Sequence, residues 1–184
     1  MNTYEPGNPI SDQLEGRLSS GEVLRYHAEP TIQQQNVAEH TWGVLVLINY
    51  LCPTAEVKLM RAALFHDTEE RIIGDIRAPM KRALRNTEAK GPLDRLEDNA
   101  REQLGVPEIH LSRYEEHVLK LADYLESLRF VAIEHEMGNQ RLKSVAQTLV
   151  TYLEKLLEAA IDAKIHNRAR CLMESYATRA GVWE

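Results

Sequence analysis

Apolar residues recur along the chain at intervals of three and four positions, which is the spacing of one face of an α-helix. The sequence lacks the sustained alternation of apolar and polar residues that is typical of a half-buried strand. The pattern therefore predicts an all-α protein. We expect helices at about residues 37–52, 54–67, 80–85, 93–104, 112–137 and 142–160, and we leave the tail beyond residue 167 unassigned.

Residues that cap or break helices support these limits. Asn36 and Thr54 stand where N-caps are needed, and Pro53 ends the helix between them. Gly74 interrupts the next apolar pattern. Residues 112–115, Ser-Arg-Tyr-Glu, form a capping-box motif at the start of a long helix.

Length and composition indicate one domain spanning residues 1–184. With 184 residues and 43% hydrophobic content the chain can build a single core, and it has no Pro-, Gly- or Ser-rich linker. The C-terminal helices, residues 139–184, carry an apolar stripe that is more often core than interface. Its residues are Leu142, Leu149, Leu153, Leu156 and Ala160.

Charge, cysteine content and hydropathy narrow the function classes. The formal net charge of -6 argues against binding of polymeric DNA or RNA through phosphates. Cys52 and Cys171 lack the spacing of a disulfide framework or a thiolate zinc site. No apolar run is long enough to cross a bilayer, so we expect a cytoplasmic protein with no membrane partner.

The stretch ALFHDTEERIIGD, residues 63–75, places His66 and Asp67 at the end of an apolar helical pattern. His40 and Asp123 interrupt the apolar faces of two other predicted helices. Imidazole nitrogens and carboxylate oxygens are ligands for divalent ions such as Zn, Co, Mn or Fe. Four such ligands would leave room for water and a substrate oxygen, as a catalytic metal requires.

Each of these residues also has an ordinary structural interpretation. A single His on an apolar face is more often a hydrogen-bonded core residue than a ligand. Adjacent residues do not share a helix face, so His66 and Asp67 can both bind a metal only where the helix ends or distorts. Asp123 can instead form a salt bridge with Lys120 on its own helix.

The order H…HD…D, together with longer blocks, resembles the HD-domain superfamily of metal-dependent phosphohydrolases. LRY at 24–26, NVAEHT at 36–41, HDTEERIIGDIRAPMK at 66–81 and KLADYLESL at 120–128 are similar to bacterial 5'-deoxynucleotidases and to compact phage deoxynucleoside triphosphate triphosphohydrolases. These blocks span residues 24 to about 130. The resemblance implies a single compact HD-domain helical bundle.

The resemblance also implies a role for individual residues. It makes His40, His66, Asp67 and Asp123 the ligands of a divalent metal ion (Co, Mn, Zn or Mg). Glu70 matches the catalytic acid, and Asp75 matches a second acid that also contacts substrate. The implied substrate-binding residues are Arg25, Tyr26, Asp75, Arg77, Pro79 and Lys81. Relatives have tryptophan where this chain has Tyr26, and Arg77 and Lys81 either contact phosphate or lie in solvent.

The predicted activity is hydrolysis at the α-phosphorus of a small-molecule 2'-deoxynucleotide. The main hypothesis is a 5'-nucleotidase that releases phosphate from a monophosphate, and the alternative is a triphosphohydrolase, for example acting on dATP. A non-catalytic regulatory or scaffold protein is the alternative of another class, and a dinuclear site using His110 or His117 is a further one. From the resemblance we expect a homo-oligomer.

Overall fold

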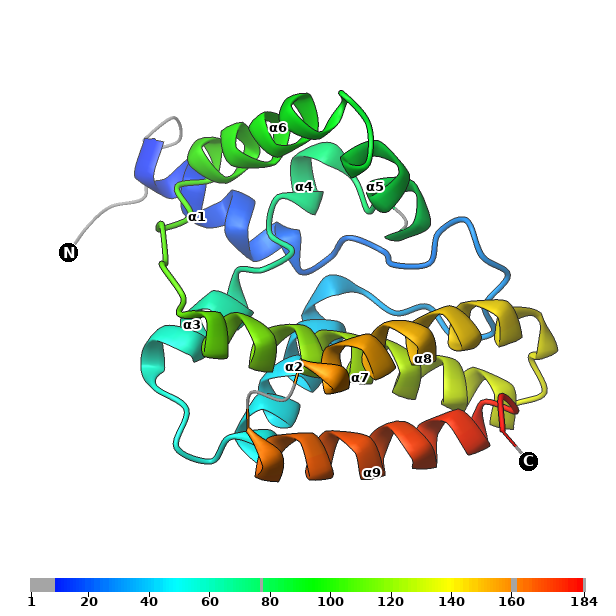
Figure 1. The fold of residues 1–184 in the computed structure, drawn as a ribbon. Helices are drawn as coiled ribbons and strands as arrows, with labels where there is room; N and C mark the ends of the chain where they lie inside the picture. Colours follow the sequence, from blue (N-terminus) through cyan, green and yellow to red (C-terminus); the bar gives the residue numbers. More distant parts are fainter. Residues whose placement is uncertain (1–8, 77, 160–161, 184) are drawn as a thin grey trace. The chain divides into compact units, whose positions relative to one another are not determined.

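Figure 1 shows the computed structural model, which describes residues 9–76, 78–159 and 162–183. The secondary structure of these residues is helical, and their extended backbone forms one isolated bridge, between Leu24 and Asn36. This confirms the all-α prediction. Within the same ranges, no helix is both long and apolar enough to span a membrane.

The chain divides into two compact units. The first contains residues 1–27, 35–39 and 65–108, and the second contains residues 28–34, 40–64 and 109–184. The prediction of one domain over residues 1–184 stays a prediction. The described helices of the first unit are α1 (Pro9–Ser20), α4 (Glu70–Ile73), α5 (Ala78–Arg85) and α6 (Lys90–Gln103). Helix α2 (Val37–Leu51) begins in the first unit and continues in the second. The other described helices of the second unit are α3 (Val57–Leu64), α7 (Arg113–Glu136), the 3-10 helix η1 (Gln140–Leu142), α8 (Lys143–Glu158) and α9 (Ala163–Arg179).

Helix α7 is the centre of the second unit. It contacts α3, α8 and α9, and α8 and α9 also contact each other (Figure 1). The apolar α7 residues that are fully buried are Val118, Leu121, Ala122, Leu125, Leu128 and Ala132. Leu142 and Leu153 of the C-terminal stripe are also fully buried, which places this part of the stripe in the core. Ala160 lies outside the described residues.

Polar groups at helix ends explain where the elements of the second unit begin and stop. The Ser112 hydroxyl accepts the Glu115 N–H at 3.3 Å while Glu115 accepts the Ser112 N–H at 2.7 Å, so the predicted capping box is confirmed. Arg168 donates to the Tyr50 and Leu51 carbonyls, two of the unpaired acceptors at the end of α2. Asp162 accepts two backbone N–H groups and so begins α9, most of which lies in the tail beyond residue 167 that we left unassigned.

The first unit is built from short helices. Helix α1 contacts α4, and α6 contacts both α4 and α5. Gly16 allows α1 to approach Leu104 closely, because a Cβ atom at position 16 would lie 2.7 Å from Leu104 Cδ2. We did not predict α1, whose apolar residues Leu14 and Leu18 are half exposed or more. Asn36 caps α2 as predicted, accepting the Glu39 N–H at 2.9 Å.

Two predicted helix limits are wrong. Helix α3 begins at Val57, and its first turn uses the Glu56 carbonyl, so the predicted cap at Thr54 lies outside the helix. The same helix ends at Leu64, before His66 and Asp67. Both residues lie in a turn that precedes the four-residue helix α4, which Gly74 ends with a positive φ of 76°. Burial of apolar side chains dictates the periodic pattern, but backbone hydrogen bonding sets the helix ends.

Candidate active site

The His66–Asp67 pair lies in a turn that the first unit holds firmly. The Arg101 guanidinium donates to the His66 carbonyl at 2.8 Å and lies 2.9 Å from Glu69 Oε2. Ser20 donates its hydroxyl to the Thr68 carbonyl at 3.2 Å. Burial raises the pKa of the Glu69 carboxyl, although the charge of Arg101 opposes the rise. These contacts fix a backbone that has left the helix, so the side chains of two adjacent residues can point the same way.

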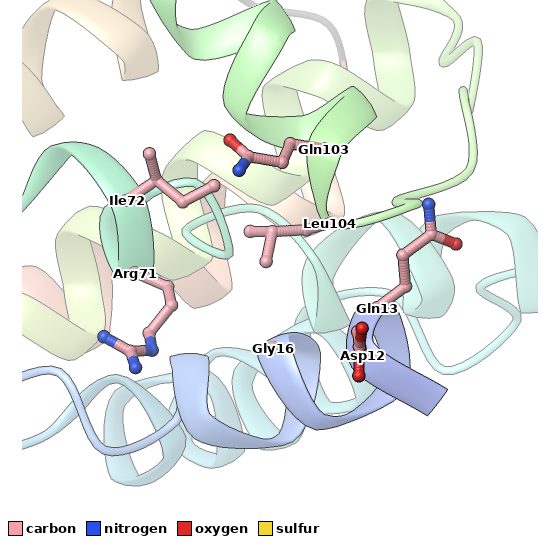
Figure 2. A pocket seen from close by; sticks show the side chains of 7 residues that line it. All are labelled: Asp12, Gln13, Gly16, Arg71, Ile72, Gln103 and Leu104. Atoms are coloured by element: carbon pink, nitrogen blue, oxygen red, sulfur yellow. The ribbon is translucent and has the colours of Figure 1, made fainter. Parts of the chain in front are cut away.

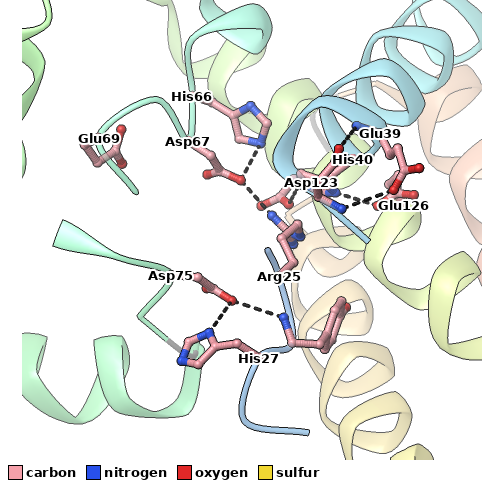
Figure 3. Close-up of polar contacts among 12 residues, drawn as sticks. Arg25, His27, Glu39, His40, His66, Asp67, Glu69, Asp75, Asp123 and Glu126 are labelled. Atoms are coloured by element: carbon pink, nitrogen blue, oxygen red, sulfur yellow. Dashed lines mark hydrogen bonds and ion pairs between the residues drawn. The ribbon is translucent and has the colours of Figure 1, made fainter. Parts of the chain in front are cut away.

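The two side chains of this turn do meet. His66 Nε2 lies 3.2 Å from Asp67 Oδ2, and Arg25 donates to that same oxygen at 2.7 Å (Figure 3). The side chains are mostly buried, with 11% of His66, 17% of Asp67 and 13% of Arg25 exposed. The structure therefore brings together three predicted site residues of the first unit, in an environment that strengthens charge interactions.

Glu70 is a buried carboxyl group at the start of α4. Burial, followed by the charge of Asp67, raises the pKa of Glu70 to about 9, while Arg25 opposes the rise and Asp75 adds to it. One carboxyl oxygen, Oε2, is buried and has no hydrogen-bond partner among the described residues. A buried group with a strongly shifted pKa and a free acceptor atom is typical of a proton-transfer residue.

Asp75 holds the segment that follows Arg25. Its Oδ2 accepts the backbone N–H of Tyr26 at 3.2 Å and lies 3.7 Å from His27 Nδ1 (Figure 3). Tyr26 has a φ of 54°, the left-handed region that non-glycine residues rarely adopt. The carboxylate thus stabilises a strained turn, and strain of this kind is common at ligand sites. The Arg25 guanidinium carbon lies 5.9 Å from the centre of the Tyr26 ring.

In the second unit, His40 of α2 lies between two acids of α7. His40 Nε2 is 3.1 Å from Asp123 Oδ1, and His40 Nδ1 is 2.5 Å from Glu126 Oε2 (Figure 3). His40 is fully buried, only 1% of the Glu126 side chain is exposed, and 31% of the Asp123 side chain is exposed. Asp123 is thus the partly accessible one of the two acids, and it faces His40.

Both His–carboxylate pairs have the spacing of metal ligands. Two ligand atoms that are each bound at about 2.1 Å lie about 3.0 Å apart in octahedral coordination and about 3.4 Å apart in tetrahedral coordination. The N–O distances of 3.1 Å in the His40–Asp123 pair and 3.2 Å in the His66–Asp67 pair fall in this range. Imidazole nitrogen and carboxylate oxygen also form the donor set that a divalent transition metal prefers. Each pair therefore offers two donor atoms of the kind and spacing that such an ion accepts.

The remaining predicted substrate-binding residues are Lys81, Arg77 and Pro79. Lys81 Nζ lies 2.7 Å from Glu97 Oε1, and although burial opposes it, the hydrogen bond and charge of Glu97 raise the pKa of Lys81. Lys81 therefore already has an anionic partner in the first unit. Arg77 lies outside the described residues, and of Pro79 only the backbone, at the start of α5, is described.

Two further features involve other residues. His117, which we considered for a dinuclear site, lies with its Nε2 2.9 Å from His166 Nε2, between α7 and α9. The first unit contains a cavity of about 470 Å³. Its lining residues, drawn in Figure 2, are Asp12, Gln13, Gly16, Arg71, Ile72, Gln103 and Leu104. The described predicted site residues are not among those that line this cavity.

Sequence reasoning missed Glu126 and His27. Glu126 stands three residues after Asp123, so both project from neighbouring positions of one helix face, and this spacing was a usable signal. His27 directly follows Arg25 and Tyr26, but nothing in its surroundings in the sequence separates it from an exposed histidine.

Comparison with known proteins identifies the family of this chain. The profile of the YfbR-like 5'-deoxynucleotidase family matches residues 21–167. This chain belongs to that family. A dATP triphosphohydrolase of Salmonella phage PMBT28 is 31% identical over 149 residues, covering 72% of this chain and 74% of the relative. A dATP triphosphohydrolase of Acinetobacter phage SH-Ab 15497 is 29% identical over 143 residues, covering 69% of this chain and 68% of the relative.

The fold has a match among solved structures. The cyanophage S-2L HD phosphohydrolase DatZ, bound to dA and one catalytic Zn²⁺ ion, aligns over 100% of both chains with a TM-score of 0.66 and 19% identity. These findings confirm the predicted resemblance, the HD-type helical fold and the class of enzyme, a metal-dependent deoxynucleotide phosphohydrolase. They favour the enzyme over the non-catalytic scaffold that we also considered.

Proposed function

We propose that this chain hydrolyses dATP at its α-phosphorus, releasing deoxyadenosine and triphosphate. Both phage relatives reported above are dATP triphosphohydrolases, and the DatZ structure holds dA, which supports adenine as the base. A 5'-nucleotidase reaction on a deoxynucleoside monophosphate is the second candidate, because the matching family is named for that activity. Both reactions break the same bond, between the α-phosphorus and the 5'-oxygen.

The observation that carries this proposal is the ligand-like spacing within both His–carboxylate pairs. We propose that His40, His66, Asp67 and Asp123 together hold one divalent cation, with Co, Mn, Zn and Mg as the ions to test. When bound, such a cation lowers the pKa of water toward about 7 and neutralises charge on phosphate oxygens. Buried acids at these positions are then stabilised by a positive partner.

We assign the proton transfers to Glu70. We assign its Oε2 atom, which has no hydrogen-bond partner among the described residues, to take the proton of the attacking water. The water oxygen bonds to the α-phosphorus, the bond to the 5'-oxygen breaks, and the leaving oxygen takes up a proton. The proton that Glu70 takes from the water is the one that it returns to the leaving 5'-oxygen, so the two transfers balance.

Substrate placement falls to the Arg25–Tyr26 segment and Asp75. Arg25 is oriented by Asp67, and its guanidinium offers further donors to a phosphate oxygen. Tyr26 is held in its left-handed conformation by Asp75, which presents its ring beside the Arg25 guanidinium. Arg77, Pro79 and Lys81 stay as predicted substrate contacts. We keep the expectations of a homo-oligomer and of a cytoplasmic location as part of this proposal.

The substrate is tested by assaying the full chain against all four dNMPs and dNTPs with each of the four cations. The expected products of dATP are deoxyadenosine and triphosphate, which ion-exchange chromatography separates from phosphate. Release of phosphate from monophosphates alone would select the nucleotidase candidate. Absence of hydrolysis with every nucleotide and cation would refute the proposed function.

The role of Glu70 is tested by Glu70→Gln, which keeps the size of the side chain and removes its basicity. We expect turnover to fall by about 10²–10⁴-fold, as for loss of a general acid–base group, with bound metal unchanged by elemental analysis. Glu102→Gln is a matched control, because Glu102 is an exposed residue of α6. Wild-type turnover in the Glu70 variant would remove Glu70 from the mechanism.

A further inference from the structure

We propose that Glu126, lying against Gly43, is a positioning residue that determines which nitrogen of His40 binds the metal ion. The inference rests on the proposed metal-dependent function and adds a residue that the family blocks did not assign. It concerns His40, Asp123, Glu126 and Gly43, all of which belong to the second unit.

The two ring nitrogens of His40 have different acidic neighbours. Nδ1 lies 2.5 Å from Glu126 Oε2, deep in the core, and Nε2 lies 3.1 Å from Asp123 Oδ1, at the accessible side (Figure 3). An ionised carboxylate only accepts hydrogen bonds, so the contact with Glu126 requires a proton on Nδ1. A neutral imidazole has one such proton, which leaves the lone pair of Nε2 for a cation.

Glu126 thereby has the role that a carboxylate commonly has beside a metal-binding histidine. An acceptor on the far nitrogen fixes the tautomer and the ring orientation and makes the near nitrogen a stronger ligand. The negative charge of Glu126 is buried, with 1% of the side chain exposed, and its other oxygen lies 3.9 Å from the Arg129 guanidinium. Burying a carboxylate is costly, and the role of orienting His40 gives a reason for its presence here.

Gly43 provides the space for this carboxylate. A Cβ atom at position 43 would lie 2.5 Å from Glu126 Cγ and 3.1 Å from both Glu126 Cδ and Oε1. Glycine inside a helix costs about 1 kcal/mol relative to alanine, so its presence in the middle of α2 calls for a reason. The close approach of Glu126 is such a reason, because any larger residue would displace the carboxylate from His40.

The test measures metal affinity and tautomer instead of activity. Full-length protein is stripped of metal and titrated with Mn²⁺ and Zn²⁺ by calorimetry, and nitrogen-15 NMR of labelled histidine reports the His40 tautomer. We expect Glu126→Ala and Gly43→Ala each to weaken metal binding by about 10- to 100-fold. Glu126→Gln retains an acceptor oxygen, and we expect a smaller loss. We also expect the Nδ1-protonated form of His40 in the wild type and a mixture of tautomers in Glu126→Ala.

Two comparisons separate positioning from general stability. Glu134→Gln alters another fully buried glutamate of α7, one that contacts a loop, and should leave metal affinity unchanged. In the Glu126→Ala background, Gly43→Ala should cause no further loss of affinity, because the atom it would displace is gone. Wild-type affinity and tautomer in both single variants would overturn the inference while leaving the metal site in place. Failure of the wild type to bind either ion would overturn the metal site and the inference together.

Discussion

Glu134 is a fully buried carboxylate in α7 that holds the loop of residues 28–34. It accepts the backbone N–H groups of Ile32 and Gln33, each at 2.7 Å, and the Asn139 side-chain amide at 2.7 Å. Asn139 also donates to the Pro30 carbonyl at 2.8 Å. The loop contributes few apolar contacts of its own, since Ile32 is 57% exposed, so these hydrogen bonds are its main attachment. The substitution Glu134→Ala removes that attachment.

The cost of this substitution can be worked from the contacts. Hydrogen bonds to a charged group contribute about 1.5–3 kcal/mol each, and Glu134→Ala removes three. Two of the three freed donors are N–H groups of exposed loop residues that water can reach, and the buried Asn139 amide keeps its bond to Pro30, so the loss should fall at or below the lower end of the sum. We expect Glu134→Ala to lower the free energy of unfolding by about 3–5 kcal/mol. Glu134→Gln keeps one acceptor oxygen and should cost about half as much.

Urea denaturation followed by circular dichroism measures this loss. With a slope of about 2 kcal/mol per molar urea, a loss of 4 kcal/mol moves the midpoint by about 2 M. Glu136→Ala is the matched control, because Glu136 lies two residues further along α7 and pairs with Arg179 at the surface. Its midpoint should move far less. If Glu134→Ala unfolds within about 0.5 M of the wild type, the loop is not held by this carboxylate.

Two further predictions concern pH and the substrate segment. Burial, followed by the charge of His166, lowers the pKa of His117 below its ordinary value of 6.5. The stability that this histidine contributes should therefore be fully present above pH 6.5 and should fall as the pH drops below it, because the unfolded chain then binds a proton that the folded chain resists. Urea midpoints between pH 8 and pH 5 measure this dependence, and His117→Gln should flatten it. Asp75→Ala removes the acceptor of the Tyr26 N–H and should lower kcat/KM for the deoxynucleotide by about 10- to 100-fold, the equivalent of one charge-assisted hydrogen bond. Asp75→Asn keeps an acceptor and should lower kcat/KM less. An unchanged kcat/KM in Asp75→Ala would contradict the role of that contact.

The sequence predicted the helices that bury an apolar face and missed those that depend on other contacts. Helix α7 has both a capping box and a continuous apolar pattern, and its N-cap, Ser112, was predicted correctly. Helix α1 has two exposed leucines and packs through Gly16, so its burial leaves little periodic signal. Helix α9 depends on the Asp162 cap after a break in the apolar stripe, and a cap alone is a weak signal without a clear pattern behind it.

For the site, residue type and order identified the histidines and acids but not the backbone that aims them. Two adjacent side chains in a helix diverge, and His66 and Asp67 converge only because α3 ends at Leu64. That early end depends on Arg101 and Ser20, which bind the turn from distant positions in the sequence. No local pattern carries this information, because the donors come from α6 and α1.

Three acids of α7 show why a buried carboxylate predicts a partner without naming it. Asp123, Glu126 and Glu134 all interrupt the apolar face of one helix, and each avoids the cost of burial in a different way. Asp123 faces His40 Nε2, Glu126 accepts from His40 Nδ1, and Glu134 accepts from the backbone of a loop. Their chemistry in isolation is nearly the same, so their roles follow from what α2 and the loop bring to each position. An acid within such an apolar face therefore predicts that a donor or a cation lies opposite. The opposing element decides which of the acids can bind a metal ion or support a metal ligand. On α2, Gly43 leaves the space in which Glu126 reaches His40.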